Sequence, residues 1–166
     1  RVCAFFFEPI QGESGVRMHP PGYLKEAEGL CRRKGILFVA DEIQTGMGRT
    51  GAFLACGRFG VSPDIVTLAK GLANGLPLGA VVARDEVAAA FAPGTHGSTF
   101  GGNPLCCAAG LAALEVMGRD AGWVAAGGGA LYCGGGCADF AAAEPAMAPT
   151  ARPATPAAAT SPVVAL

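Results

Sequence analysis

The sequence predicts an α/β fold with a mostly parallel sheet and flanking helices. Two continuous apolar runs, at residues 2–7 and 36–40, each end at an acidic residue, and a stretch of helical periodicity separates them. Runs of this kind are typical of strands that are buried on both faces. Strand, helix and strand in this order form the unit from which parallel sheets are built.

The helix between the two runs is predicted from its ends and from its spacing. It begins after Pro20 and Pro21 and stops at Gly35, and its last turn is basic, which suits a helix C-terminus. Its apolar residues recur at helical spacing, at Leu24, Ala27, Leu30 and Cys31.

Two further strands and one further helix are predicted beyond residue 60. The strands are the short apolar runs 64–68 and 78–83. The helix extends from Pro104 to about Met117, because Asn103 suits the N-cap and proline suits the first helical position. Loops that contain glycine connect the elements, at 45–51, 71–79 and 94–102.

The composition changes at about residue 119 and divides the chain into two predicted parts. Residues 1–118 carry 20 of the 25 charged side chains, whereas residues 119–166 contain 28 Ala, Gly or Pro among 48 positions. The second part has too little large apolar surface to offset the entropy of ordering it. We therefore expect one folded domain over 1–118, and a tail over 119–166 that is disordered or translated in a shifted reading frame.

Charge, hydropathy and cysteine content exclude several classes of protein. The 12 Lys and Arg nearly balance the 13 Asp and Glu, so no basic surface for nucleic acid or anionic lipid is predicted. No apolar run approaches the length of a membrane span. The seven cysteines form neither a CxxC pair nor a metal-site spacing, which favours reduced thiols and a cytoplasmic protein. Because the first residue is Arg1, any targeting leader is unreadable.

The polar residues that could carry chemistry follow the predicted strands. In an open α/β sheet, ligands bind beyond the carboxyl ends of the strands. The side chains expected at this edge are Glu8, Glu13, Asp41, Glu42, Gln44 and Lys70. Acids, an amide and a lysine are therefore expected to converge there.

Lys70 and Asp41 are the strongest candidates at this edge. Lys70 is the only lysine after Lys34, and a lysine in a desolvated pocket can form a Schiff base with an aldehyde cofactor. Asp41 ends a buried strand, and a protonated ring nitrogen would supply the cation that a buried carboxylate needs. The alternatives are a solvated loop lysine and an aspartate that caps the next turn.

Other candidates are weaker. Segment 94–104 combines Gly, Ser and Thr before a helix N-terminus, where backbone amides favour a phosphate, although an ordinary connection has the same pattern. His19 and His96 are not spaced as ligands of one metal, so no metal site is predicted. Arg17 and Arg49 are either partners of a substrate carboxylate or solvated loop residues.

Four segments together carry a resemblance to a known family. They are 7–13 (FEPIQGE), 41–51 (DEIQTGMGRTG), 63–72 (PDIVTLAKGL) and 97–105 (GSTFGGNPL). In this order they resemble class III pyridoxal-phosphate (PLP) aminotransferases over about residues 2–117, with residues 94–99 similar to the acetylornithine branch. The resemblance implies the three-layer fold type I of PLP-dependent transferases, present here as a partial large domain.

The resemblance also assigns residues to the PLP site. The Schiff-base lysine, which shuttles the substrate α-proton, falls on Lys70, and the acid paired with the pyridine nitrogen falls on Asp41. Gln44 corresponds to the amide near the ring oxygen, and Ile43 would lie against the ring face.

A second group of residues is assigned in the same way to the phosphate and the substrate. Ser98 and Thr99 correspond to the hydroxyls that reach the phosphate of the neighbouring subunit's cofactor, which implies a homodimer. Glu13 corresponds to the carboxylate that pairs with a substrate-binding arginine, and Glu8 lies near the same pocket.

The implied reaction transfers an amino group from N-acetylornithine to 2-oxoglutarate, giving N-acetylglutamate semialdehyde and glutamate in arginine biosynthesis. Class III enzymes for ornithine, succinylornithine or 4-aminobutyrate are alternatives, as is a catalytically inactive fragment. The family's phosphate loop, ring-stacking aromatic and carboxylate-binding arginine have no counterpart in the sequence. We therefore expect a fragment of the large domain, truncated in front and shifted in frame behind.

Overall fold

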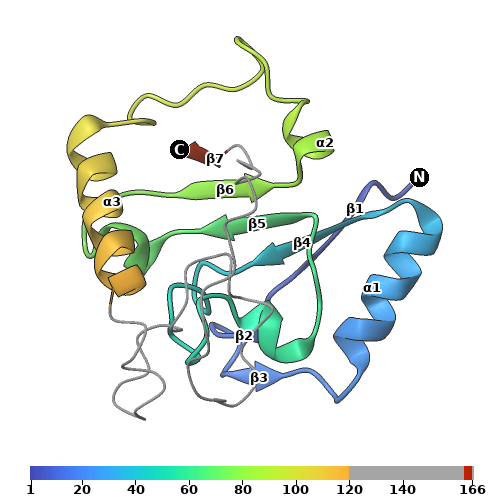
Figure 1. Cartoon of the computed structure of the whole chain (residues 1–166). Coiled ribbons are helices and arrows are strands. Elements are labelled where there is room, and N and C mark those ends of the chain that lie inside the picture. Colours follow the sequence, from blue (N-terminus) through green and yellow to red (C-terminus); the bar gives the residue numbers. More distant parts are fainter. Residues whose placement is uncertain (120–162, 166) are drawn as a thin grey trace, which may run out of the picture.

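The main sheet of the computed structural model has five strands in the order β1-β4-β5-β6-β7. The structure describes residues 1–119 and 163–165. β1, β4 and β5 are parallel neighbours, whereas β6 is antiparallel to β5 and β7 is antiparallel to β6. The strands are β1 (Ala4–Phe7), β4 (Leu37–Asp41), β5 (Ile65–Leu68), β6 (Ala80–Ala83) and β7 (Val163–Ala165). Figure 1 shows β4 and β5 ending on the same side of the molecule, toward α3.

In Figure 1, α1 lies to the right of the strands and α3 lies to their left. A small hairpin precedes α1 in the chain. The helices are α1 (Tyr23–Lys34), α2 (Asp85–Ala88) and α3 (Pro104–Arg119), with the 3₁₀ turns η1 (Ala55–Phe59) and η2 (Lys70–Ala73). The hairpin pairs β2 (Ile10–Gln11) with β3 (Arg17–Met18). None of the described helices is long and apolar enough to cross a membrane. Apart from Arg119 and β7, the expected tail lies outside the described residues.

Both predicted helices are confirmed, and local chemistry explains their ends. Gly35 adopts a left-handed conformation with φ 63°, and Ile36 N–H donates to the Cys31 carbonyl at 2.9 Å, which closes α1. At the start of α3, the Asn103 side-chain oxygen accepts hydrogen bonds from the backbone N–H groups of Leu105 and Cys106, at 3.0 and 3.3 Å. Asn103 is therefore the N-cap that the sequence predicts.

The direction of β6 was not anticipated from its apolar sequence. Parallel strands need a crossover connection of about a dozen residues or more, usually a helix. Residues 69–79 between β5 and β6 form only η2 and a turn. The chain therefore returns beside β5 in the antiparallel direction.

Burial along the strands follows their place in the sheet. Phe38, Val39 and Ala40 of the inner strand β4 are all at most 1% exposed, as predicted for a strand buried on both faces. On β1, Phe7 is buried and stacks on Phe38 with ring centroids 4.3 Å apart, but Phe6 is 69% exposed. The prediction that both faces of the strand are buried is thus wrong for β1. In the described part of the chain β1 is an edge strand, and its outer face is left uncovered at Phe6.

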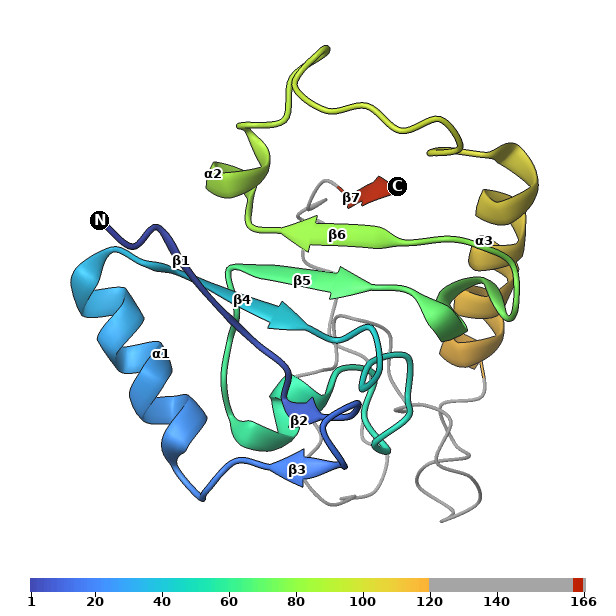
Figure 2. The same ribbon diagram turned by 180° about the vertical axis from the view of Figure 1, so that it is seen from behind.

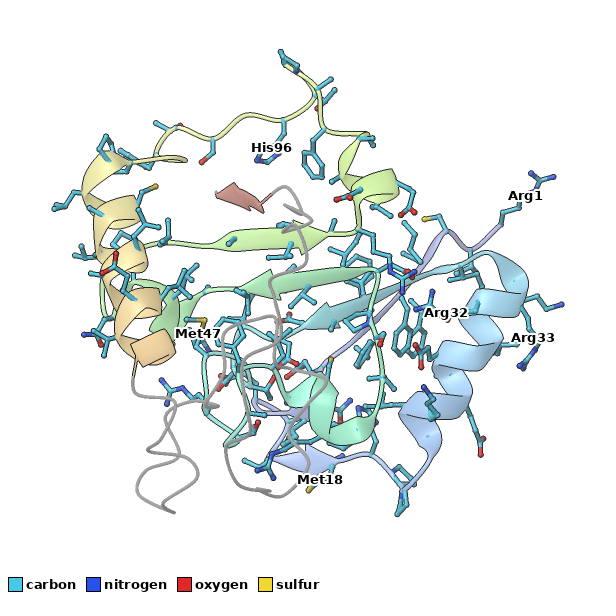
Figure 3. The ribbon with its side chains drawn as sticks, viewed as in Figure 1. Arg1, Met18, Arg32, Arg33, Met47 and His96 are labelled. Carbon is cyan, nitrogen blue, oxygen red and sulfur yellow. The ribbon has the colours of Figure 1, made fainter. Side chains whose placement is uncertain are left out.

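Charged residues fasten α1 to the loop before β5. Arg32 donates to Asp64 Oδ1 at 3.2 Å and to the Ser62 carbonyl at 2.7 Å, and Phe38 N–H donates to Asp64 Oδ2 at 2.8 Å. Figure 3 shows Arg32 lying between α1 and the sheet, whereas Arg33 points outward. Because Asp64 also holds β4, this cluster fixes α1 against both central strands.

Glu28 of α1 gives the fold a defined dependence on pH. Burial raises its pKa, but hydrogen bonds from Lys25, from Ser62 N–H and from Arg32 outweigh burial, so the pKa lies below 4.5. The resulting stability is present above pH 4.5 and is lost as the pH falls through the lowered pKa. We expect Glu28→Gln to reduce the free energy of unfolding by about 1–2 kcal/mol at about pH 7 and much less at about pH 3.

Urea denaturation at both pH values measures this effect. The exposed Glu26 of the same helix provides the matched control, because Glu26→Gln removes a carboxylate without removing these hydrogen bonds. An equal loss for Glu28→Gln at both pH values would contradict the assignment.

Candidate functional site

The ends of β4 and β5 bring the two principal candidates to one edge of the sheet. Asp41, the last residue of β4, pairs in register with Thr67 of β5. Lys70 lies two positions after Leu68, the end of β5, and begins η2. Because β4 and β5 are parallel, Asp41 and Lys70 both lie at their carboxyl ends, the side where open α/β sheets bind ligands.

The Asp41 carboxylate has one of the two roles that the sequence left open, that of capping the next turn. Its Oδ1 accepts a hydrogen bond from Ile43 N–H at 3.0 Å, so the side chain caps the turn that follows β4. Within the described residues, Oδ2 accepts no hydrogen bond. Asp41 is only half-buried, so one carboxylate oxygen remains available to a donor from a ligand.

The sequence left two environments open for Lys70, a desolvated pocket and a solvated loop, and the structure shows the second. Among the described residues Lys70 is exposed and its amine forms no ion pair. Its backbone is left-handed, with φ 50°, a conformation that costs energy for a residue with a Cβ atom. Such local strain concentrates at functional sites, where the surrounding structure holds it.

Gln44 and Glu13 meet although 31 positions separate them in the chain. Gln44 Nε2 donates a short hydrogen bond to Glu13 Oε1, which joins the turn after β4 to the loop between β2 and β3. Glu8 Oε2 accepts from Gly12 N–H at 3.0 Å in the same loop, and the Glu8 carbonyl accepts from His19 Nε2 at 2.8 Å. The structure thus brings Glu8, Glu13 and Gln44 to one region.

Ser98 and Thr99 lie elsewhere. Both are exposed in the segment between α2 and α3, which runs beyond β6 and β7 (Figure 2). His96 lies in the same segment, with its ring 6.5 Å from that of Phe91 (Figure 3), whereas His19 stacks on Tyr23. No group of three residues suited to a metal ion occurs in the part of the chain that the structure describes.

The two candidate arginines, Arg17 and Arg49, form fewer contacts with the described residues than Glu8, Glu13 and Asp41 do. Arg17 lies on β3 and is exposed. Arg49, also exposed, borders a cavity of about 600 Å³ between the turn after β4, η2 and α3, next to Met47 and Asn74. Neither guanidinium forms an ion pair with a described residue.

Glu42 was expected at the ligand edge, and this expectation is wrong, because its side chain faces the core. Its side chain is 0% exposed; Oε1 accepts from Cys56 N–H at 2.7 Å, and Oε2 accepts a short hydrogen bond from Thr45 Oγ1. Burial, and then the neighbouring Glu42 carboxylate, raises the pKa of the Cys56 thiol, so this thiol stays protonated at neutral pH. Asp41 and Glu42 are adjacent acids, and nothing in the sequence distinguishes the one that faces the edge from the one that faces the core.

The matches to known proteins cover most of the described chain. A sequence model of the family described as aminotransferase class-III matches residues 1–125, somewhat beyond the segment on which the resemblance rests. The acetylornithine aminotransferase of Methanopyrus kandleri is 58% identical over 116 residues, which are 70% of this chain and 30% of that protein. An ornithine aminotransferase of Bacillus cereus is 55% identical over 117 residues, again 70% and 30% of the two chains.

A solved structure extends this similarity to the fold. The ornithine aminotransferase from Toxoplasma gondii, which has PLP at partial occupancy in its active site, matches with a TM-score of 0.68 and 52% identity, over 73% of this chain and 28% of that one. The fold is therefore part of the α/β fold type I of PLP-dependent transferases. The chain spans about 30% of the length of the curated relatives that it matches. On the family match and these identities, the chain belongs to the class III aminotransferases.

Proposed function

We propose that this chain supplies the lysine and the pyridine-binding acid of a PLP-dependent class III aminotransferase. The observation that supports the proposal most strongly is the shared edge of β4 and β5, where Asp41 keeps an oxygen without a hydrogen bond among the described residues and Lys70 presents an exposed amine. The donor set fits PLP, because a protonated ring nitrogen needs an acceptor and an aldehyde needs an amine. PLP supplies that aldehyde and an electron-accepting ring when it is bound.

Each residue at this edge then has a defined task. Asp41 would hold the N–H of the ring and keep the ring nitrogen protonated. Lys70 would hold the cofactor through its amine, and that amine would move the substrate α-proton from one carbon to another. Gln44 and Ile43 orient the ring from the turn after β4, while Gln44 also holds Glu13 in place.

The reaction we propose for the whole protein is transamination from N-acetylornithine to 2-oxoglutarate, a step of arginine biosynthesis. It is supported by the 58% identity to an acetylornithine aminotransferase. Ornithine, succinylornithine and 4-aminobutyrate are the competing donors, since an ornithine enzyme is 55% identical. Glu13 is the residue we assign to the substrate side, with Glu8 near the same pocket.

We further propose a cytoplasmic homodimer. Ser98 and Thr99 lie in a segment away from Asp41 and Lys70 and are exposed, which suits a role at the phosphate site of a second copy. The five described cysteines are free thiols, which suits a reducing compartment.

Titration of the chain with PLP tests the proposed function. We expect the absorbance of PLP to shift on binding, and we expect Asp41→Asn to weaken PLP binding about tenfold or more, because the amide no longer holds a proton on the ring nitrogen. The matched control is Asp85→Asn, which changes an exposed acid on α2. Equal PLP affinity in wild type and Asp41→Asn would refute the assignment of Asp41.

The donors are then compared with the same preparation. Transfer from N-acetylornithine in preference to ornithine, succinylornithine and 4-aminobutyrate supports the substrate proposed. Binding of PLP without transfer from any donor supports the alternative, a catalytically inactive chain.

A further inference from the structure

The carboxylate of Glu42 is buried without a cation. Glu42 is 0% exposed, and no lysine or arginine in the described residues forms an ion pair with it. Among the described residues, hydrogen bonds from Cys56 N–H and from Thr45 Oγ1 compensate for its burial. Burying a carboxylate costs free energy, and losing either contact would leave it without that compensation. The two contacts also connect the turn after β4 to η1.

The backbone of Glu42 closes the turn that carries the cofactor residues. Its N–H donates to the Thr67 carbonyl at 3.0 Å, which extends the pairing with β5 beyond Asp41. Its carbonyl accepts from Gly46 N–H at 2.8 Å, so residues 42–46 form one closed turn. Ile43 and Gln44 lie inside this turn, and Asp41 directly precedes it.

This turn also contacts the segment that carries Lys70. A Cβ atom on Gly46 would lie 2.9 Å from Leu68 Cδ2, which shows how closely the turn approaches the end of β5. A Cβ atom on Gly71 would lie 3.4 Å from Met47 Cβ, so Met47 packs against the residue that follows Lys70. Met47 is 4% exposed and left-handed, with φ 57°, and Figure 3 shows it beside α3.

We infer that Glu42 is a positioning residue, whose buried carboxylate sets the placement of Asp41 and Gln44 relative to Lys70. It touches no ligand itself and acts through the turn it closes and through the contact of Met47 with Gly71. The inference rests on the proposed PLP site, and it assigns to Glu42 a geometric role rather than an electrostatic one. Small displacements of reacting groups are enough to cost large factors in binding and rate.

Two substitutions separate geometry from charge. Glu42→Gln keeps the length of the side chain, because its amide oxygen can accept from Cys56 N–H and its amide nitrogen can donate to Thr45 Oγ1. Glu42→Ala removes both contacts. We expect Glu42→Gln to bind PLP within about threefold of wild type and Glu42→Ala to bind it about tenfold or more weakly.

A matched control removes the effect of stability alone. Leu24 of α1 is 2% exposed and belongs to the hydrophobic core, so Leu24→Ala destabilises the fold without removing either hydrogen bond of the Glu42 carboxylate. The urea midpoint of Leu24→Ala should be as low as that of Glu42→Ala. Even so, we expect Leu24→Ala to bind PLP within about threefold of wild type. Should Glu42→Ala not fold, Thr45→Val removes one of the two hydrogen bonds, with Thr45→Ser as its control.

Amide hydrogen exchange without PLP supplies the second measurement. In Glu42→Ala we expect faster exchange at Ile43, Gly46 and Cys56, while Leu24→Ala accelerates exchange in α1 instead. Unchanged exchange at the turn, or faster exchange with unchanged PLP affinity, overturns the positioning role while leaving the proposed function intact. If the wild-type chain does not bind PLP, both the proposed function and this role of Glu42 are refuted.

Discussion

Replacing Lys70 with alanine is expected to abolish the change in absorbance that PLP undergoes on binding to this chain. The reason is chemical, since the aldehyde of PLP needs a primary amine and Lys70 is the one lysine at the edge formed by β4 and β5. Lys70→Arg should fail equally, although it keeps the positive charge, because a guanidinium does not replace the amine. The measurement is the PLP absorbance spectrum across a titration of each variant.

Lys25→Ala provides the control for this experiment. Lys25 is also a lysine, but it lies on α1, where it donates to Glu28 and to the Gly60 carbonyl. We expect this variant to keep the spectral change of wild type. If Lys70→Ala kept the change while Lys25→Ala lost it, the site would lie on α1 and not at the sheet edge.

Replacing Gly46 with alanine is expected to have the largest effect on stability. The new Cβ atom would lie 2.7 Å from the Glu42 carbonyl oxygen and 2.9 Å from Leu68 Cδ2. The leucine methyl can rotate away, but the carbonyl belongs to the backbone and accepts the hydrogen bond that closes the turn. We expect a loss of about 2–3 kcal/mol in the free energy of unfolding, measured by urea denaturation.

Gly118→Ala is the matched control for Gly46→Ala. Gly118 lies in α3, where an added Cβ atom would meet no atom of the described residues within 4 Å beyond its chain neighbours and its own helix backbone. Because alanine favours helix more than glycine does, this change should be neutral or stabilise the chain by up to about 1 kcal/mol. A Gly46→Ala variant as stable as Gly118→Ala would show that the turn after β4 is not packed as described.

The parts of the fold that could be predicted from sequence are those whose cause is local. Gly35 ends α1 and Asn103 begins α3 through hydrogen bonds to residues only a few positions away. The direction of β6 and the exposure of Phe6 depend instead on which strands become neighbours in the sheet. Neither property is contained in the apolar run of a single strand.

The same distinction applies to the candidate site. Asp41 and Lys70 could be placed at one edge because the end of each strand is readable from its own sequence. The contact of Gln44 with Glu13 and the burial of Glu42 against Cys56 join residues far apart in the chain. Short-range patterns do not predict such pairs, and Glu42 resembles Asp41 in sequence while facing the opposite environment.

The most direct test of the account is the position at which PLP can be fixed to the chain. The chain offers four amines, at Lys25, Lys34, Lys70 and the N-terminus. Reduction of the PLP-bound chain with borohydride, followed by peptide mass mapping, identifies the amine that reacted. We predict that PLP is found on Lys70 and that Asp41→Asn reduces its yield there; PLP on Lys25 or Lys34, or spread evenly over all four amines, would contradict the site.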